Sequence, residues 1–160
     1  MTATYEKIAT TTLGSAASEI VFTSISGSYT DLVIVADCQT TAGNTFTMRF
    51  NSDSGTNYSQ TVISGDGSSA SSFKSTNISS LYLGDITNAR MVYLINIMNY
   101  KNTAVNKTIL VRQNYSAGSV TARSGLWRNT AAITSIRLAP FSAVDLLAGS
   151  VATLYGIKAE

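Results

Sequence analysis

The feature that most constrains the fold of this chain is the regular return of turn residues after short segments of alternating apolar and polar residues. The clearest case is the segment 45–50. Phe46, Met48 and Phe50 occupy one set of alternate positions, here called one parity, and polar residues occupy the other. Successive side chains of a strand point to opposite faces, so this segment predicts a half-buried β-strand. No long stretch repeats apolar residues at helical spacing, which argues against long helices.

Further segments of the same kind follow one another at intervals of 10 to 15 residues. The segments predicted as strands are 19–25, 31–40, 45–50, 58–63, 78–83, 90–100, 107–114, 120–127, 133–138 and 151–158. The segment 90–100 is apolar on both parities, which predicts burial of both its faces. We therefore expect an all-β fold: an antiparallel β-sandwich of nine or ten short strands, jelly-roll-like in its connections.

A chain of 160 residues suits a single domain, which we expect to span 1–160. The stretch 64–76 is rich in glycine and serine and has no apolar anchor before Phe73. It predicts an exposed, mobile loop within that domain. The alternative interpretation is a linker, although each flank alone is short for a good core.

The sequence offers little for catalysis because it contains no histidine. This excludes catalytic pairs of serine or cysteine with histidine, and Cys38, the one cysteine, cannot complete a zinc site. Cys38 lies in an apolar run, which favours an inert thiol in or beside the core over a reactive one. The acids are scattered, mostly in turns: Asp31, Asp53, Asp66, Asp85 and Asp145. We interpret them as solvated turn residues rather than a pair for glycoside hydrolysis, and predict no catalytic, cofactor-binding or metal-binding residue and no cofactor.

Two short motifs have a second interpretation. The run Asn51-Ser52-Asp53-Ser54-Gly55 places oxygen-bearing side chains two residues apart before a glycine, which resembles part of a calcium loop. No distal glutamate follows it, and the other interpretation is a turn between strands. The run Gly65-Asp66-Gly67 carries the same ambiguity with fewer oxygen ligands.

Aromatic residues are the remaining candidates for ligand contact, because aromatic rings stack on sugars in carbohydrate-binding modules. The residues concerned are Tyr58, Tyr82, Tyr93, Tyr100, Tyr115 and Trp127. Each has the alternative of packing in a sheet face with its polar atom at the edge.

The net charge of +2 comes from basic residues spread along the chain without a cluster. Nucleic-acid binding requires a clustered positive surface, so no nucleic-acid partner is expected. The chain has no apolar stretch of membrane-helix length and no signal-peptide pattern at its start. We therefore expect no membrane partner, and folding in a cytosol-like compartment.

Several pieces distributed over most of the chain resemble a loose set of small virion proteins of tailed bacteriophages. These pieces are 5–9, 20–25, 29–32, 48–59, 125–128, 131–136 and 152–158. The resemblance implies a virion structural protein, assembled in the cytoplasm of a bacterial host and then located in the virion. It further implies association with itself as a homotrimer and with the major capsid protein or another virion protein.

Within this family two roles are open. The first is a capsid decoration (cement) protein, for which the segment 1–13 is a candidate arm that adds a strand to a neighbour. The alternative for that segment is a first strand in its own domain. The second role is a host-recognition module on a fibre or tail, which would bind a surface glycan through a shallow aromatic groove.

Overall fold

The computed structural model describes residues 4–114 and 120–158, and this part of the chain forms twelve strands and no helix. The strands of the first half are β1 (Tyr5–Thr12), β2 (Ile20–Phe22), β3 (Asp31–Cys38), β4 (Asn44–Phe50), β5 (Tyr58–Gly65) and β6 (Ala70–Ile78). Those of the second half are β7 (Leu81–Ile86), β8 (Met91–Met98), β9 (Lys107–Asn114), β10 (Val120–Trp127), β11 (Ile136–Pro140) and β12 (Val151–Ile157). Accordingly, the described residues include no helix suited to crossing a membrane.

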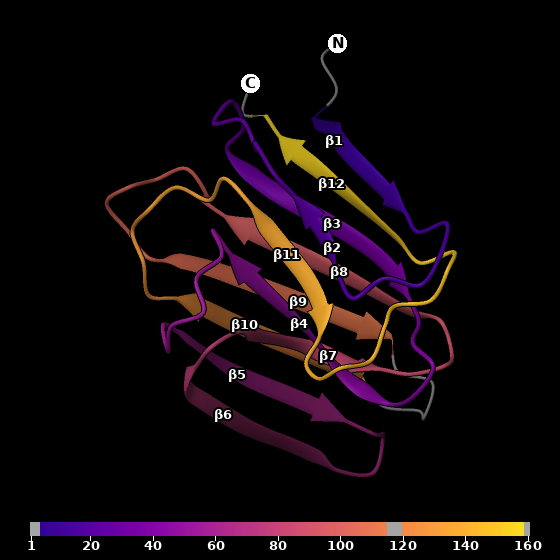
Figure 1. The fold of residues 1–160 in the computed structure, drawn as a ribbon. Helices are drawn as coiled ribbons and strands as arrows, with labels where there is room; N and C mark the ends of the chain where they lie inside the picture. Colours follow the sequence, from indigo (N-terminus) through magenta and orange to yellow (C-terminus); the bar gives the residue numbers. More distant parts are fainter. Residues whose placement is uncertain (1–3, 115–119, 159–160) are drawn as a thin grey trace.

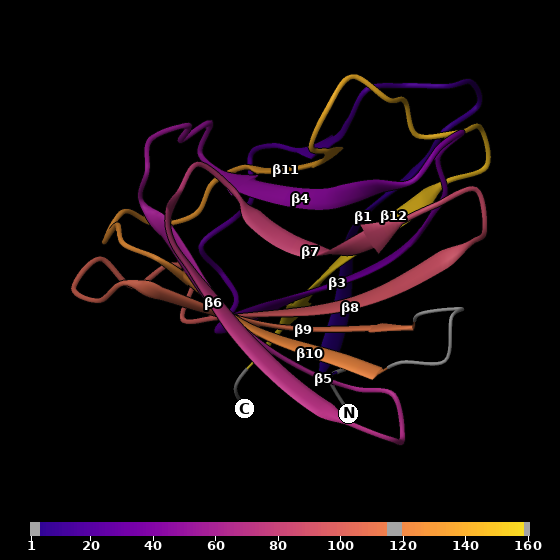
Figure 2. The same cartoon turned by 90° about the horizontal axis from the view of Figure 1, so that it is seen from below.

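The strands form two antiparallel sheets that pack as a sandwich, which confirms the predicted fold class (Figure 1). The larger sheet has eight strands in the order β1-β12-β3-β8-β9-β10-β5-β6, and the smaller has the order β2-β11-β4-β7. Figure 2 shows the layer of β11, β4 and β7 lying over the layer of β3, β8, β9 and β10. The predicted number of nine or ten strands is wrong, because β1 and β6 add two edge strands that lack a strong apolar alternation.

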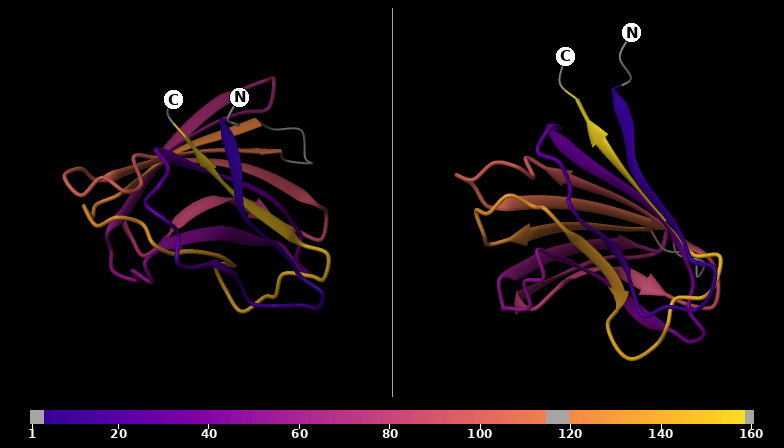
Figure 3. Two further views of the ribbon diagram at one scale, coloured as in Figure 1. Left: turned by 90° about the horizontal axis from the view of Figure 1, so that it is seen from above. Right: turned by 45° about the horizontal axis from the view of Figure 1, so that its top comes forward.

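The pairing of the strands is nested along the chain. β1 pairs with β12, β2 with β11, β3 with β8 and β4 with β7, so the first four strands meet later ones in reverse order. Figure 3 shows β1 and β12 lying side by side at one margin of the molecule. The hairpins β5–β6 and β9–β10 interrupt this order, and the pairing of β5 with β10 makes both of them extensions of the larger sheet.

The core lies between the inner faces of the two sheets. In the larger sheet, Leu154, Ile34, Ile95 and Val111 form one continuous cross-strand row, and each is buried. The smaller sheet faces this row with the apolar parity predicted for 45–50, whose three side chains are fully buried. Because each such side chain contributes about 1.5–3 kcal/mol on burial, this layer is the main source of stability.

The segment 64–76, expected as a loop, is mostly strand. The end of β5 and the start of β6 form a hairpin, with Gly65 opposite Ala70. Between them, the Asp66 carboxylate accepts hydrogen bonds from the backbone N–H of Ser68 (2.8 Å) and Ser69 (2.7 Å), and Gly67 takes a φ of 86°. An edge strand is held by its backbone ladder and needs no buried side chains, which explains why the apolar pattern does not reveal β6.

The predicted burial of both faces of 90–100 is also wrong for a single chain. On β8 the side chains of Met91, Tyr93 and Ile95 are fully buried, whereas Val92 is 42% exposed. The smaller sheet covers only one face of the larger one, so within residues 4–114 and 120–158 no second sheet lies over the other apolar side of β8.

The start of the chain forms β1 within its own sheet, as the alternative interpretation of 1–13 holds. A bulge between Lys7 and Ala9 interrupts its ladder with β12. The other side of β1 is an open sheet edge, since β1 is the outermost strand of the order. Residues 1–3 lie outside the described residues, and the use of this segment as an arm toward a neighbour remains a prediction.

Candidate functional site

The most distinctive surface is the side of the eight-stranded sheet that points away from the smaller sheet, which we call the outer face. Strand register places its side chains in cross-strand rows. One row consists of Tyr155, Val33, Asn96, Leu110 and Ser124, and the next consists of Thr153, Val35, Leu94, Arg112, Ala122 and Ile63. Aliphatic and aromatic residues therefore dominate the centre of a solvent-facing surface.

Several of these apolar side chains are substantially exposed to solvent, although Val33 is buried. Val35, Val92 and Leu110 are about two-fifths exposed, and Ile63 is 62% exposed. The centre of the face also holds a shallow hollow of 310 Å³, lined by Tyr5, Val33, Val35, Leu94, Asn96, Arg112 and Tyr155. Scattered apolar residues are normal on protein surfaces, but contiguous ones mark contact sites.

Two charged residues, Asp37 and Arg112, lie among these apolar side chains. Asp37 on β3 forms an ion pair with Arg90, with 3.0 Å between Oδ1 and Nη1. Arg112 on β9 is exposed, and no hydrogen bond or ion pair joins it to a side chain in 4–113 or 120–158. The outer face thus combines apolar area with three cations that form no ion pair within the described residues: Arg112 near its middle, Lys7 on β1 and Lys74 on β6.

A second hollow, of 350 Å³, lies toward the β5–β6 end of the same sheet. Hydroxyl-bearing residues and one cation line most of it: Ser59, Thr61, Lys74, Ser75, Thr76, Thr108 and Ser124. The aliphatic side chain of Leu126 also lines it. Many hydroxyl groups around a shallow depression can exchange hydrogen bonds with a polyhydroxylated ligand.

The aromatic residues proposed for ligand contact are mostly in the core. Tyr58, Tyr93, Tyr100 and Trp127 are buried, and the rings of Tyr58 and Trp127 stack at 6.3 Å between centroids. Tyr82 is half-buried and meets Phe141 edge-on at 5.7 Å, while Tyr115 lies outside the described residues. The structure therefore does not bring these aromatic residues together on a surface. The four buried rings pack inside the sandwich, in agreement with the second interpretation given above.

The run 51–55 is a closed turn, and its carboxylate is fully engaged by donors. Asp53 accepts hydrogen bonds from Trp127 Nε1 (2.7 Å), Asn57 Nδ2 (2.9 and 3.2 Å) and the Gly55 N–H (2.9 Å). Burial of Asp53 opposes its ionisation, but these hydrogen bonds outweigh burial and lower its pKa. A carboxylate that accepts N–H groups on both oxygens is poorly suited as a calcium ligand, so the turn interpretation is the one that the geometry supports.

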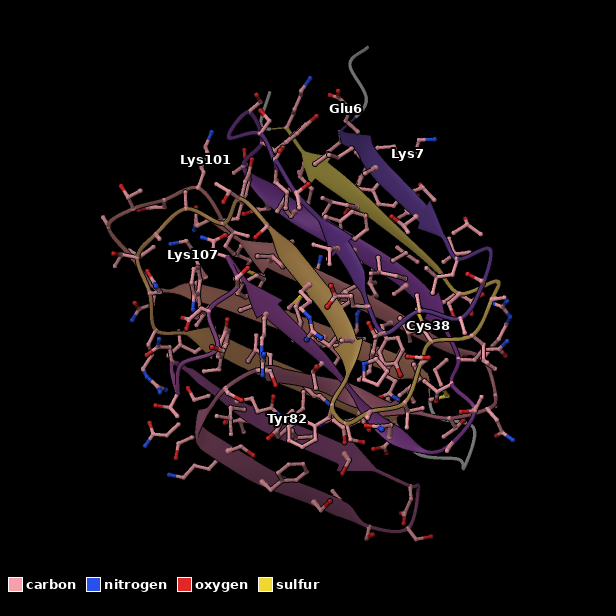
Figure 4. The ribbon with its side chains drawn as sticks, in the orientation of Figure 1. Glu6, Lys7, Cys38, Tyr82, Lys101 and Lys107 are labelled. Carbon is pink, nitrogen blue, oxygen red and sulfur yellow. The ribbon has the colours of Figure 1, made fainter. Side chains whose placement is uncertain are left out.

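Lys107, at the start of β9, is fully buried and is not among the residues predicted as functional from the sequence (Figure 4). Its ammonium donates to the carbonyl oxygens of Asn102 (2.6 Å), Val105 (2.8 Å) and Thr130 (3.0 Å). Burial lowers the pKa of Lys107, while three hydrogen bonds use every N–H of the charged form. A signal was present in the sequence, because Lys107 shares its strand parity with the buried Ile109 and Val111.

Cys38 lies in the core at the other end of the sandwich from Lys107 (Figure 4). Burial, followed by the nearby charge of Asp37, raises the pKa of its thiol to about 12. The inert thiol predicted for this position is therefore consistent with its environment. Over the two described ranges, no group of three potential metal ligands among histidine, cysteine, aspartate and glutamate comes together.

Comparison of this chain with protein-family models, with curated proteins and with solved structures found no match.

Proposed function

We propose that this chain is a bacteriophage virion structural protein that coats or stabilises the head as a capsid decoration (cement) protein. The observation that carries the proposal is the outer face, which is apolar, exposed and built on a sandwich whose core is already complete. Such a surface serves a protein that assembles with others. The resemblance described above supplies the class of assembly, and self-association and contact with the major capsid protein are parts of the proposal.

The connectivity of the sandwich gives separate support. Without the two inserted hairpins, the strands have the orders β1-β12-β3-β8 and β2-β11-β4-β7, with four nested antiparallel pairs. We propose to classify this arrangement as a jelly roll, extended on one sheet by β9, β10, β5 and β6. Jelly rolls occur in viral capsid and lectin domains, so this support is an analogy of fold.

The test is the location of the chain in purified particles of the phage that encodes it. Mass spectrometry should detect the chain at many copies per particle, and cryo-electron microscopy should place density of this sandwich on the outside of the head. Particles of a deletion mutant should lose that density and release their DNA at lower temperature. Absence of the chain from particles would overturn the proposal.

A second candidate function, a fibre- or tail-associated host-recognition module, is favoured by the hydroxyl-lined hollow around Lys74. Its ligand would be a surface glycan, and Lys74 would favour an acidic one. A glycan array with the full chain tests this function, with Lys74→Ala and Ser124→Leu as variants in the hollow. Binding that both variants abolish supports the module, and an array without a hit argues against it.

A further inference from the structure

The outer face has the features of a surface that matches a copy of itself. We propose that two copies of this chain pair through their outer faces about a twofold axis, so that Arg112 of each copy meets Asp37 of the other. This inference rests on the assembly role proposed above and names the partner of that surface, with a twofold pair in place of the homotrimer that the resemblance implies.

The available area fits a stable pair. The six strands β1, β12, β3, β8, β9 and β10 lie side by side in the larger sheet. At the usual strand spacing and rise, six strands of about eight residues cover roughly 29 by 26 Å, about 750 Å². A standard interface buries about 800 Å² on each partner. The outer face alone is therefore large enough for a specific contact between two copies.

Two charged residues near the middle of the outer face, Arg112 and Asp37, complement one another when this face meets a copy of itself, whereas Lys7 lies at its margin on β1. Arg112 has no partner within the described part of the chain. Asp37 is engaged through one oxygen by Arg90, and the side chain is 42% exposed. In an isologous interface, if one residue contacts a second across the axis, the second also contacts the first. One arginine and one carboxylate on each copy thus give two equivalent ion pairs.

The register of the strands places these two residues symmetrically. Asp37 lies opposite Val92, and Arg112 lies opposite Leu94, on either side of β8. A twofold axis that lies in the plane of contact, passes over β8 between Val92 and Leu94 and runs perpendicular to the line from Asp37 to Arg112 brings Arg112 of one copy over Asp37 of the other. The same axis brings the aliphatic centre of one face onto that of the other, where Val35 and Leu94 become buried.

The outer side of the smaller sheet lacks this combination. Its exposed parity includes Arg49, which donates to the Ser79 carbonyl (3.0 Å), and Arg137, which pairs with Glu19. Val21, 41% exposed, is its large aliphatic residue on β2. This side therefore supplies a matched control position at which a charge should leave pairing unchanged.

The test is sedimentation velocity of the full chain over a concentration series, with circular dichroism to verify folding. Wild type and Val21→Lys should both sediment as a dimer, and Leu94→Lys should sediment as a folded monomer. Arg112→Asp and Asp37→Arg should each weaken pairing at least about tenfold, because each places like charges opposite one another.

An equimolar mixture of the Arg112→Asp and Asp37→Arg chains gives the decisive result. In a mixed pair, the introduced aspartate of one chain would meet the introduced arginine of the other, and the native Asp37 and Arg112 would form the second ion pair. The mixture should therefore dimerise at concentrations at which each chain alone is largely monomeric. A monomeric wild type, a trimer insensitive to Leu94→Lys, or a mixture that stays monomeric overturns the inference. A paired chain that is absent from virions would instead overturn the proposed function alone.

Discussion

The inner and outer faces of the eight-stranded sheet have similar residues and different surroundings. Leu94 and Ile95 are neighbours on β8, yet Ile95 is fully buried and Leu94 is only partly buried. The smaller sheet covers the first, and neither sheet of the described residues covers the second. An apolar parity thus indicates that a face is covered, but it does not indicate whether the cover comes from the same chain.

The charged residues of β9 repeat this difference. Lys107 on the inner parity is buried and donates to three carbonyl oxygens. Arg112 on the outer parity is exposed and, across both described ranges, has no such partner. The inner cation is part of the folded chain, whereas the outer one is available to another molecule.

The largest expected effect separates the two neighbours on β8. Ile95→Ala should lower the free energy of unfolding by about 4 kcal/mol, because it leaves a cavity in the core. Leu94→Ala should cost less than about 1 kcal/mol in the monomer, since its site is partly open to water. Urea unfolding at a concentration that keeps the chain monomeric measures both. Equal losses of unfolding free energy would show that Leu94 and Ile95 contribute equally to the stability of the monomer.

A smaller but substantial effect is expected for the two cations of β9. Lys107→Met should cost about 3 kcal/mol, because three carbonyl oxygens lose their donor in a buried site. Arg112→Met keeps similar bulk on the outer face and should change the monomer by no more than about 0.5 kcal/mol. Thermal unfolding of both variants makes this comparison, and a destabilised Arg112→Met would mean that the arginine has a role inside the fold.

Asp53 tests how the inner face is anchored at Trp127. Its pKa is lowered in the folded state, so its contribution is complete above the unfolded value of about 3.9 and is lost as pH falls through the folded value. Asp53→Asn should cost about 2 kcal/mol at pH 7 and reduce the loss of stability below pH 4. Unfolding at pH 7 and pH 3 tests this, and a variant with the wild-type acid dependence would contradict it.

The smallest perturbation compares thiols on the two faces. Cys38 on the inner side should not react with a thiol reagent at neutral pH until the chain is unfolded, because burial raises its pKa to about 12. A Val35→Cys variant adds a thiol on the outer face of the same strand, and this thiol should react in the monomer. Protection of that thiol at high concentration would sharpen the assignment of the outer face as a contact surface.

The parts of the fold that follow from side-chain burial were predictable. The alternation of 45–50 gave the position and the buried parity of β4, and turn residues separated most of the other strands correctly. β6 was missed because an edge strand needs only backbone pairing, and a serine-rich segment offers no apolar pattern. The second set of alternating apolar residues in 90–100 indicates the outer face. The sequence pattern predicts that these residues are buried, but they are not buried within the described chain.

The contacts of polar groups were harder to foresee. The roles of Asp53 and Lys107 depend on residues distant in sequence, such as Trp127 and Thr130. A single sequence gives the identity of these groups without their pairing, which only the arrangement of the strands supplies. The calcium and turn interpretations of 51–55 could therefore not be separated before the position of Trp127 was known.

The nested order of the strands has a consequence for synthesis on the ribosome. Because β1 pairs with β12, its ladder cannot begin before residue 151 has left the exit tunnel and cannot be completed before residue 157 has done so. The hairpins β5–β6 and β9–β10 join neighbouring segments and can form early, while the closing pairs bring together distant parts of the chain. We expect slow and late completion of the sandwich, during which the nascent apolar strands depend on protection from aggregation.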